Sequence, residues 1–335
     1  MSFEQFIAKE MYAKVRGLGD RLVLMKEQID WVPFVPLVKR VFHDDKVIGG
    51  RPHTDELVVV RSMLLQSWYG LSDEELEFQC HDRLSFRNFL GFPESVPDFS
   101  TIWKIRDKLK QNNIDALIWT ELQKQLDKKG YEIKKGVVQD ATFIEADLGR
   151  KRYAKEKQNK KEGKEIIYTD KQKSHIDKDG SFSVKHGQVH YGYKNHVKID
   201  VDNNLIRKIV TTTAKVHDGE IDLVKNGDVA AYRDKGYFGK KLGAKNVVDK
   251  TMKRGTIAGK INGGQQKRNK AIGKIRSPGE RPFSVIKRVF GGGRTTVKNL
   301  ERVSIKELFK AIAYNLYQLV TLERKKVARV LKIFQ

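Results

Sequence analysis

The segment GVVQDATFIEAD, residues 136–147, decides the fold class of this 335-residue chain. Its β-branched residues, which alternate with polar ones past Asp140, predict a strand. The other positions of this strand include Val138 and Ile144, and an unpaired carboxylate among such residues is costly to bury. Asp140 therefore either faces solvent at a sheet edge or has a cation as its partner.

The sequence after this strand has a pattern typical of an α/β domain. HYGYKNHVKIDVDNNLIRKIVTTTAKVHD, residues 190–218, predicts two strands joined by a turn at Asp202-Asn203-Asn204. Helices and strands then alternate, which favours a mixed sheet with helices packed on it. The further predicted elements are a helix at 220–226, a strand at 229–234, a helix at 240–249, a strand at 251–257 and helices beyond them.

Residues 1–130 show the helical spacing of apolar residues instead. SDEELEFQCHD opens with a capping box of Ser72 and Glu75. VPDFSTIWKIRDKLK follows, with Lys104 and Arg106 among the cations around its apolar face. This module is either a helix-turn-helix that enters the major groove, with those two residues as DNA contacts, or a basic bundle that supports another domain.

Charge is the largest global signal of the chain. Its 66 Lys and Arg residues against 42 Asp and Glu give a formal net charge of +24, so a polyanion is the first partner to consider. No apolar run is long enough to span a bilayer, and we expect a soluble cytoplasmic protein with no membrane partner. The single Cys80 excludes an intramolecular disulfide and a zinc finger built on paired cysteines.

A basic insertion at about residues 150–180 interrupts the predicted sheet. Its core, residues 150–173, holds ten Lys and Arg against four Asp and Glu, with little apolar periodicity. Such a stretch is either a solvated insertion or an arm that becomes ordered on a nucleic acid.

Asp234 stands in a chemical context like that of Asp140. It ends the short apolar strand in VAAYRDKGYFG, between Arg233 and Lys235. A strand that ends in a turn with solvated charges is the simplest interpretation. If this strand lies beside the first one, however, the two aspartates come together at one place in the sheet.

A third carboxylate, Glu280, lies in KIRSPGERPFSVIKRVFGGG. Arg276 precedes it by four residues and Lys287 follows it by seven, spacings that place all three on one face of a helix. Ser277 and Glu280 also have the spacing of a capping box, so Glu280 is alternatively only a cap. Pro282 argues against the cap, since a proline five positions into a helix removes a hydrogen bond.

These motifs resemble, in their order and spacing, the DDE transposases of bacterial insertion sequences, specifically the insertion-sequence-5 type. YGYKNHVKID, TTTAKVHD and the segment from GRPHTDELVVV to VPDFSTIWKIRDKL also match, so the resemblance covers about residues 45–322. The family usually has a tyrosine three residues before the arginine, where this chain has Gly273. The residues that carry the resemblance are Asp140, Asp234, Arg276, Glu280 and Lys287.

The resemblance implies an α/β catalytic domain with a ribonuclease H-like mixed sheet at residues 131–322. An all-α N-terminal domain at 1–130, with a role in DNA binding, would precede it, and a basic tail at 323–335 would follow. Such enzymes bind the terminal inverted repeats of their element, cut the DNA and join the freed 3′ ends to a target. The expected partners are therefore double-stranded DNA and a second copy in a DNA-bound homodimer, associated with the bacterial nucleoid.

The resemblance also implies a role for each charged residue. Three carboxylates can hold two Mg²⁺ or Mn²⁺ ions that activate the attacking oxygen and stabilise the leaving one. The expected catalytic and metal-binding residues are Asp140, Asp234 and Glu280. The expected DNA contacts are Arg276, Lys287, Arg233 and Lys235, together with Lys104 and Arg106.

Other interpretations remain open at this point. His217 and Asp218 either add a base or metal contact or are a hydrogen-bonded pair at a strand end. A metal-dependent nuclease of the same fold would cut DNA without joining it. A DNA-binding protein derived from a transposase would need no catalysis, and the presence of all three acids argues against that alternative.

Overall fold

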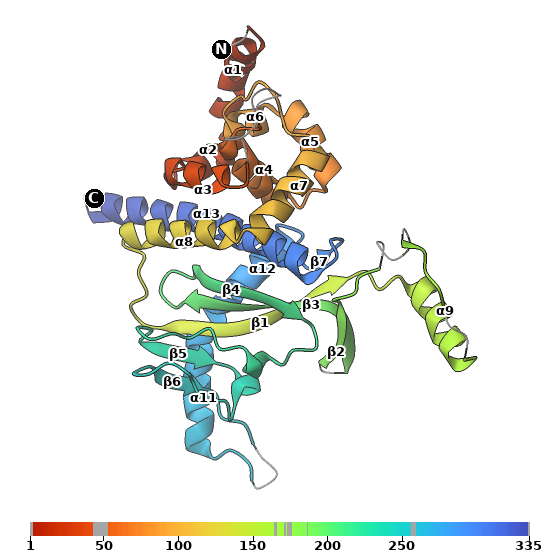
Figure 1. Cartoon of the computed structure of the whole chain (residues 1–335). Coiled ribbons are helices and arrows are strands. Elements are labelled where there is room, and N and C mark those ends of the chain that lie inside the picture. Colours follow the sequence, from red (N-terminus) through yellow and green to blue (C-terminus); the bar gives the residue numbers. More distant parts are fainter. Residues whose placement is uncertain are drawn as a thin grey trace. The chain divides into compact units, whose positions relative to one another are not determined.

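The computed structural model describes residues 3–42, 53–163, 166–170, 172, 176–185, 187–255 and 259–333 (Figure 1). The chain forms two compact units, which we describe separately. The helical unit comprises Met1–Glu132, Asn203–Leu205 and Leu308–Gln335, and the sheet unit comprises Ile133–Asp202 and Ile206–Glu307.

Side-chain caps determine where the helices of the helical unit begin. Ser72 Oγ accepts from the N–H of Glu75 at 3.1 Å, which is half of the predicted capping box, while Glu75 accepts from Gln79 instead of returning to Ser72. Within the described residues no helix is long and apolar enough to cross a membrane. The helices are α1 (Phe3–Gly17), α2 (Arg21–Lys26), α3 (Val35–Lys39), α4 (Glu56–Tyr69), α5 (Asp73–Asp82), α6 (Leu84–Leu90), α7 (Phe99–Gln111) and α8 (Ile114–Lys128).

Arg106 of α7 belongs to the interior of the helical unit. It is 2% exposed, and its guanidinium donates to both oxygens of Asp73 at 2.8 Å and to Gln66 at 3.0 Å. The structure argues against the expected DNA contact of Arg106, because a bidentate pair with a carboxylate already uses the face of the guanidinium that a phosphate would need. Lys104, on the same helix, is exposed.

The last helix, α13 (Leu300–Ile333), contributes its first residues to the sheet unit and the remainder to the helical unit. Residues 308–322, which the sequence assigned to the catalytic domain, thus belong to the helical unit. Contacts hold this part of α13 in the helical unit, since the Tyr131 hydroxyl donates to Glu323 at 2.7 Å and the Tyr317 ring meets the Trp68 ring edge-on. The expected basic tail continues α13 as far as Ile333, and residues 334–335 lie outside the described residues.

The sheet unit is built on a mixed sheet with strand order β2-β3-β1-β5-β6, in which β4 also pairs with β3 and β7 with β1. The pairs of β3 with its neighbours are antiparallel, whereas β1, β5 and β6 run parallel to one another. The predicted hairpin is present as β3 and β4. The strands are β1 (Val137–Ala146), β2 (Ser181–Lys185), β3 (Gln188–Asp200), β4 (Ile206–Thr213), β5 (Ala230–Arg233), β6 (Val248–Thr251) and β7 (Arg294–Thr295).

The loops after β4 hold less helix than the sequence predicted. The helix expected at 220–226 is reduced to the 3-10 turn Asp218–Glu220, and residues 240–247 form an irregular loop before β6. Side chains explain the difference, because oxygens of Asp222 and Asn226 accept from backbone N–H groups of that loop.

The predicted insertion lies between β1 and β2. Its described part includes α9 (Arg150–Lys161), with largely exposed side chains from Tyr153 onward. The Tyr153 ring packs on Phe182 of β2, with 5.5 Å between ring centroids. Residues 164–165, 171 and 173–175 of the insertion lie outside the described residues.

The central position of β1 places Asp140 in the middle of the sheet. β1 pairs with β5 in parallel register, Gln139 opposite Arg233. Continued by one residue, this register sets Asp140 beside Asp234, which directly follows β5. Two strands that the sequence separates by a hairpin therefore bring both aspartates to one place.

A helical segment crosses the sheet at this point. It consists of α11 (Gly263–Arg276), the 3-10 turn Ser277–Glu280 and α12 (Arg281–Arg288). α11 packs against β5. The close approach depends on Gly279, since a Cβ there would stand only 3.2 Å from a methyl group of Val138 on β1.

Candidate active site

A cavity of about 510 Å³ opens beside the end of β5 and Phe143 of β1. Asp234 and Asp218 are among its lining residues. The other charged residues of its lining are cations, which is the balance expected for a site that binds an anionic substrate next to carboxylates. These cations are Lys185, Lys194, Lys235, Arg254 and Arg276.

The position of Asp234 follows from the turn after β5. Its Oδ1 accepts from the N–H of Gly236 at 2.8 Å and so caps the 3-10 turn Lys235–Tyr237. The expected turn chemistry is therefore present. It uses only one carboxylate oxygen in the contacts the structure shows, and the side chain still lines the cavity.

Asp140 is held between an arginine and the backbone. Its Oδ2 accepts from Arg276 Nη2 at 2.7 Å, and its Oδ1 accepts from the N–H of Ala141 at 2.9 Å. Burial raises the pKa of Asp140 and the nearby Asp234 carboxylate adds to the rise, while Arg276 and the Ala141 N–H oppose it. The two aspartates thus repel each other in a desolvated place, and an additional cation would stabilise both of them.

Glu280 is not part of this pair in the structure. It is exposed at the end of the 3-10 turn and makes no side-chain cap, so the alternative role as a cap is wrong. In the described part of the chain, no three His, Cys, Asp or Glu residues are arranged to hold a metal ion. The structure therefore brings together Asp140 and Asp234 of the three expected acids, and leaves Glu280 outside.

The two aspartates suit a hard divalent cation. Their carboxylate oxygens are the ligand type that Mg²⁺ and Mn²⁺ prefer. The partly buried Asp140, whose side chain is 20% exposed, already has a cationic partner in the Arg276 guanidinium, whose side chain is 13% exposed. The donor set thus fits a metal ion, provided that the ion and Arg276 share or exchange the Asp140 carboxylate.

The expected DNA contacts of the sheet unit differ in their positions relative to the cavity. Lys235 and Arg276 line the cavity, and Arg276 Nε has no hydrogen-bond partner among the residues that the structure describes. Lys287 is exposed as a residue. Partial desolvation of its ammonium group nevertheless lowers its pKa, and the Glu145 carboxylate opposes that change. Arg233, by contrast, is 1% exposed and its Nε and Nη2 donate to groups inside the unit, which argues against the expected DNA contact.

Lys194 was not among the expected site residues, yet it is buried in the wall of the cavity. Its Nζ lies 2.8 Å from both Asp218 Oδ1 and the carbonyl oxygen of Val216. It also lies over the Phe143 ring, 4.8 Å from the centroid. A lysine inside an alternating strand was the available signal, but the pattern cannot say which face of the strand carries the cavity.

His217 is hydrogen-bonded in the way the simpler interpretation proposed. Its Nδ1 accepts from the N–H of Gly219 at 3.1 Å. The ring nevertheless lines the cavity together with Asp218. The interpretation of His217 as a hydrogen-bonded residue is thus confirmed, while a role as a base or metal contact stays a prediction.

Comparison with known protein families gives two matches. Residues 9–108 match the Transposase domain (DUF772), and residues 131–316 match the Transposase DDE domain. No solved structure matches the chain. Since the second match alone covers more than half of the chain, the chain belongs to the DDE transposases of insertion sequences, which carry out metal-dependent DNA cleavage and strand transfer on a ribonuclease H-like fold.

Proposed function

We propose that Asp140 and Asp234 are the catalytic carboxylates of this transposase, and that the cavity beside them receives the ends of the element. The observation that supports this is the parallel register of β1 and β5, which, continued by one residue, brings Asp140 opposite Asp234, and Asp234 lines a cavity together with five cations. The substrates are the terminal inverted repeats of an insertion sequence of the insertion-sequence-5 type, and target DNA.

Two Mg²⁺ or Mn²⁺ ions are the proposed cofactors. Bound at these carboxylates, they would activate the attacking water or 3′-hydroxyl and stabilise the leaving oxygen. Glu280 is the proposed third ligand. It follows Arg276 by four residues, at the end of the 3-10 turn Ser277–Glu280 that continues α11. Because Arg276 reaches Asp140, an exposed Glu280 side chain one turn away has a short path to the same place.

Arg276 has two proposed tasks. It neutralises Asp140 while the site holds no substrate, and it lines the cavity, where its guanidinium can hold a phosphate oxygen. Lys235 and Lys287 are proposed as further phosphate contacts, as point charges without a fixed geometry. No covalent link between enzyme and DNA is required, since water and the 3′-hydroxyl are the nucleophiles.

In the helical unit, α7 is the proposed DNA contact. Lys104 and Lys108 are exposed one turn apart on this helix, and both line a cavity of about 390 Å³. The exposed rings of Phe99 and Trp103 lie on the same helix. Exposed cations next to aromatic rings suit contact with the DNA backbone.

We also propose a homodimer on DNA, since joining an element to a target requires its two ends to be brought together. Association with the bacterial nucleoid would follow from the net charge of +24.

Substitution of the acids tests the proposed site. Asp140→Ala, Asp234→Ala and Glu280→Ala should each abolish Mg²⁺-dependent cleavage and strand joining while DNA binding is retained, as measured with labelled repeat ends. Asp147→Ala is the matched control, because Asp147 is an exposed acid just after β1 and should retain activity. Normal strand transfer by any of the three variants would remove that residue from the site. Cleavage by the wild type without joining would favour the nuclease alternative.

A further inference from the structure

Arg233 presents a problem that the proposed function leaves open. It is the last residue of β5, directly before Asp234, and it is 1% exposed. A buried guanidinium is costly unless every donor has a well-placed acceptor. Because Arg233 contacts neither solvent nor the cavity, its role must lie in its effect on the neighbouring residues.

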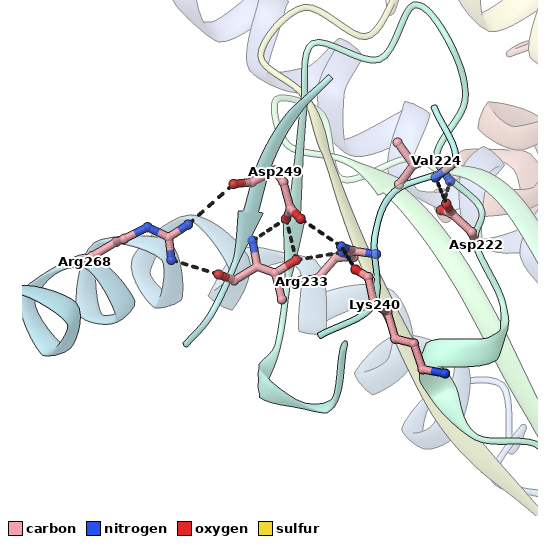
Figure 2. Close-up of polar contacts among 8 residues, drawn as sticks. Asp222, Val224, Arg233, Lys240, Asp249 and Arg268 are labelled. Atoms are coloured by element: carbon pink, nitrogen blue, oxygen red, sulfur yellow. Dashed lines mark hydrogen bonds and ion pairs between the residues drawn. The ribbon is translucent and has the colours of Figure 1, made fainter. Parts of the chain in front are cut away.

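The contacts of Arg233 all go to one loop and the strand that follows it (Figure 2). Its Nε donates to Thr251 Oγ1 at 2.8 Å, and its Nη2 donates to the Lys240 carbonyl oxygen at 2.9 Å and to Asp249 Oδ2 at 3.1 Å. Asp249 and Thr251 lie on β6, where Thr251 is paired with Arg233 in the sheet register.

The acceptors of Arg233 are themselves fixed. Asp249 Oδ1 accepts from the N–H of Thr251 at 2.8 Å and from its hydroxyl. Burial raises the pKa of Asp249, but these hydrogen bonds and the Arg233 guanidinium outweigh it and hold the pKa below its ordinary value. The carboxylate is therefore charged at neutral pH and gives the guanidinium a permanent partner.

The loop that Arg233 closes is the one that orients Asp234. This loop runs from Lys235 to β6, and its first turn supplies the Gly236 N–H that holds the Asp234 carboxylate. The guanidinium also lies over the ring of the buried Tyr237, 5.6 Å from its centroid. One side chain thus ties the middle and the end of the loop to the strand from which Asp234 emerges.

We infer that Arg233 is a positioning residue for Asp234. It touches neither DNA nor metal, and it acts by fixing the backbone on both sides of the turn that presents the Asp234 carboxylate to the cavity. The planar fork of arginine is suited to this task, because it holds several acceptors in a fixed geometry that lysine cannot reproduce. The inference rests on the proposed role of Asp234.

Arg268 provides a matched control. It lies on α11 and donates to the backbone of the same strand, to the Thr251 carbonyl oxygen at 2.8 Å and to that of Asp249 at 3.4 Å (Figure 2). Arg268 makes no contact with the 235–247 loop among the interactions the structure shows. Removal of Arg268 therefore weakens the attachment of β6 without releasing the turn at Asp234.

The test compares Arg233→Lys and Thr251→Val with Arg268→Gln in the full-length protein. The two readouts are the Mn²⁺ affinity of the protein without DNA, from the paramagnetic resonance signal of free Mn²⁺, and kcat at saturating DNA. Arg233→Lys should weaken Mn²⁺ binding and lower kcat by about 10- to 100-fold, the usual effect of losing a residue that orients a metal ligand. Thr251→Val should act in the same direction but less, and the DNA Kd should stay unchanged in both.

Wild-type Mn²⁺ affinity and kcat in both Arg233→Lys and Thr251→Val would overturn the inference. So would an equal loss in Arg268→Gln, since the effect would then come from β6 as a whole. If Arg233→Lys does not fold, as judged by its thermal transition, Thr251→Val and Asp249→Asn decide the matter in its place. Asp234→Asn separates the two proposals: retained strand transfer in that variant refutes the proposed site, whereas its loss alongside intact Arg233 and Thr251 variants refutes only the positioning role.

Discussion

At the Asp140 side of the cavity the guanidinium of Arg276 contacts the carboxylate itself, at 2.7 Å. At the Asp234 side the guanidinium of Arg233 contacts the loop behind the carboxylate. The first arginine is partly exposed and faces the cavity, so a metal ion or a phosphate can compete for it. The second is enclosed, so nothing that enters the cavity can reach it. Two arginines next to two aspartates thus differ in whether the substrate can change their contacts.

The largest effect should come from the accessible arginine. Arg276→Gln removes the cation next to Asp140 and a donor to the phosphate, and it should lower the rate of strand transfer by about 100-fold, the usual scale for losing a charged donor at a reacting phosphate. Single-turnover assays with pre-cut repeat ends measure the rate. Lys274→Gln, which removes an exposed cation two residues earlier on α11, is the control and should remain close to wild type.

Metal affinity should change in opposite directions at the two sides. Arg276→Gln frees the Asp140 carboxylate and should tighten Mn²⁺ binding without DNA by roughly two- to tenfold, the scale of a partly exposed charge interaction. Arg233→Lys should weaken it. Paramagnetic resonance of free Mn²⁺ at pH 8 distinguishes the two outcomes. Weaker binding in both variants would mean that Arg276 orients Asp140 instead of competing for it.

The contrast between the two arginines also marks the limit of sequence reasoning. The β-branched run around Asp140 and the apolar run before Asp234 predicted two strands, which bring the aspartates together if they lie side by side. Side-chain alternation, however, cannot tell a cation that faces a cavity from one that faces a loop. Arg233 and Lys235 flank Asp234 symmetrically in the sequence, yet the first is buried and the second lines the cavity.

Long-range pairings account for the other differences. Arg106 has the helical spacing of a surface cation. Its burial depends on its ion pair with Asp73, which lies on another helix. Asp222 and Asn226 accept from backbone groups about 20 residues further along the chain, which replaces the helix that local spacing predicted. Such contacts depend on the packed fold, which local propensity does not encode.

The pH dependence of stability should also distinguish the two sides. His196 on β3 pairs with Ala141, next to Asp140, and burial lowers its pKa from 6.5 to about 4, with Lys194 adding to the fall and Asp218 opposing it. Because the unfolded chain takes up the proton first, stability is complete above about pH 6.5 and is lost as the pH falls toward 4. Between pH 7.5 and 5.5 the loss should be about 1 kcal/mol.

Hydrogen exchange of the β1 and β3 amides, expressed as protection factors, measures this loss at the Asp140 side. His196→Gln keeps a donor for Thr212 but cannot take up a proton, so its protection should vary less with pH than that of the wild type. The amides of β6, at the Asp234 side, serve as the internal reference. An equal loss of protection in wild type and variant would show that another group is responsible.

The smallest effects should come from the two exposed lysines, one at each side of the site. Lys235 follows Asp234 and lines the cavity. Lys287 lies on α12, where it interacts electrostatically with Glu145 on β1. Lys235→Ala and Lys287→Ala should each weaken DNA binding only a few-fold, independently of DNA sequence, and reduce the slope of log K against log salt by about one. Binding measured by fluorescence anisotropy over a range of salt concentrations gives both quantities. Because neither lysine holds a carboxylate, Mn²⁺ affinity should be unchanged, and a change in one variant alone would move that lysine into the same class as Arg276.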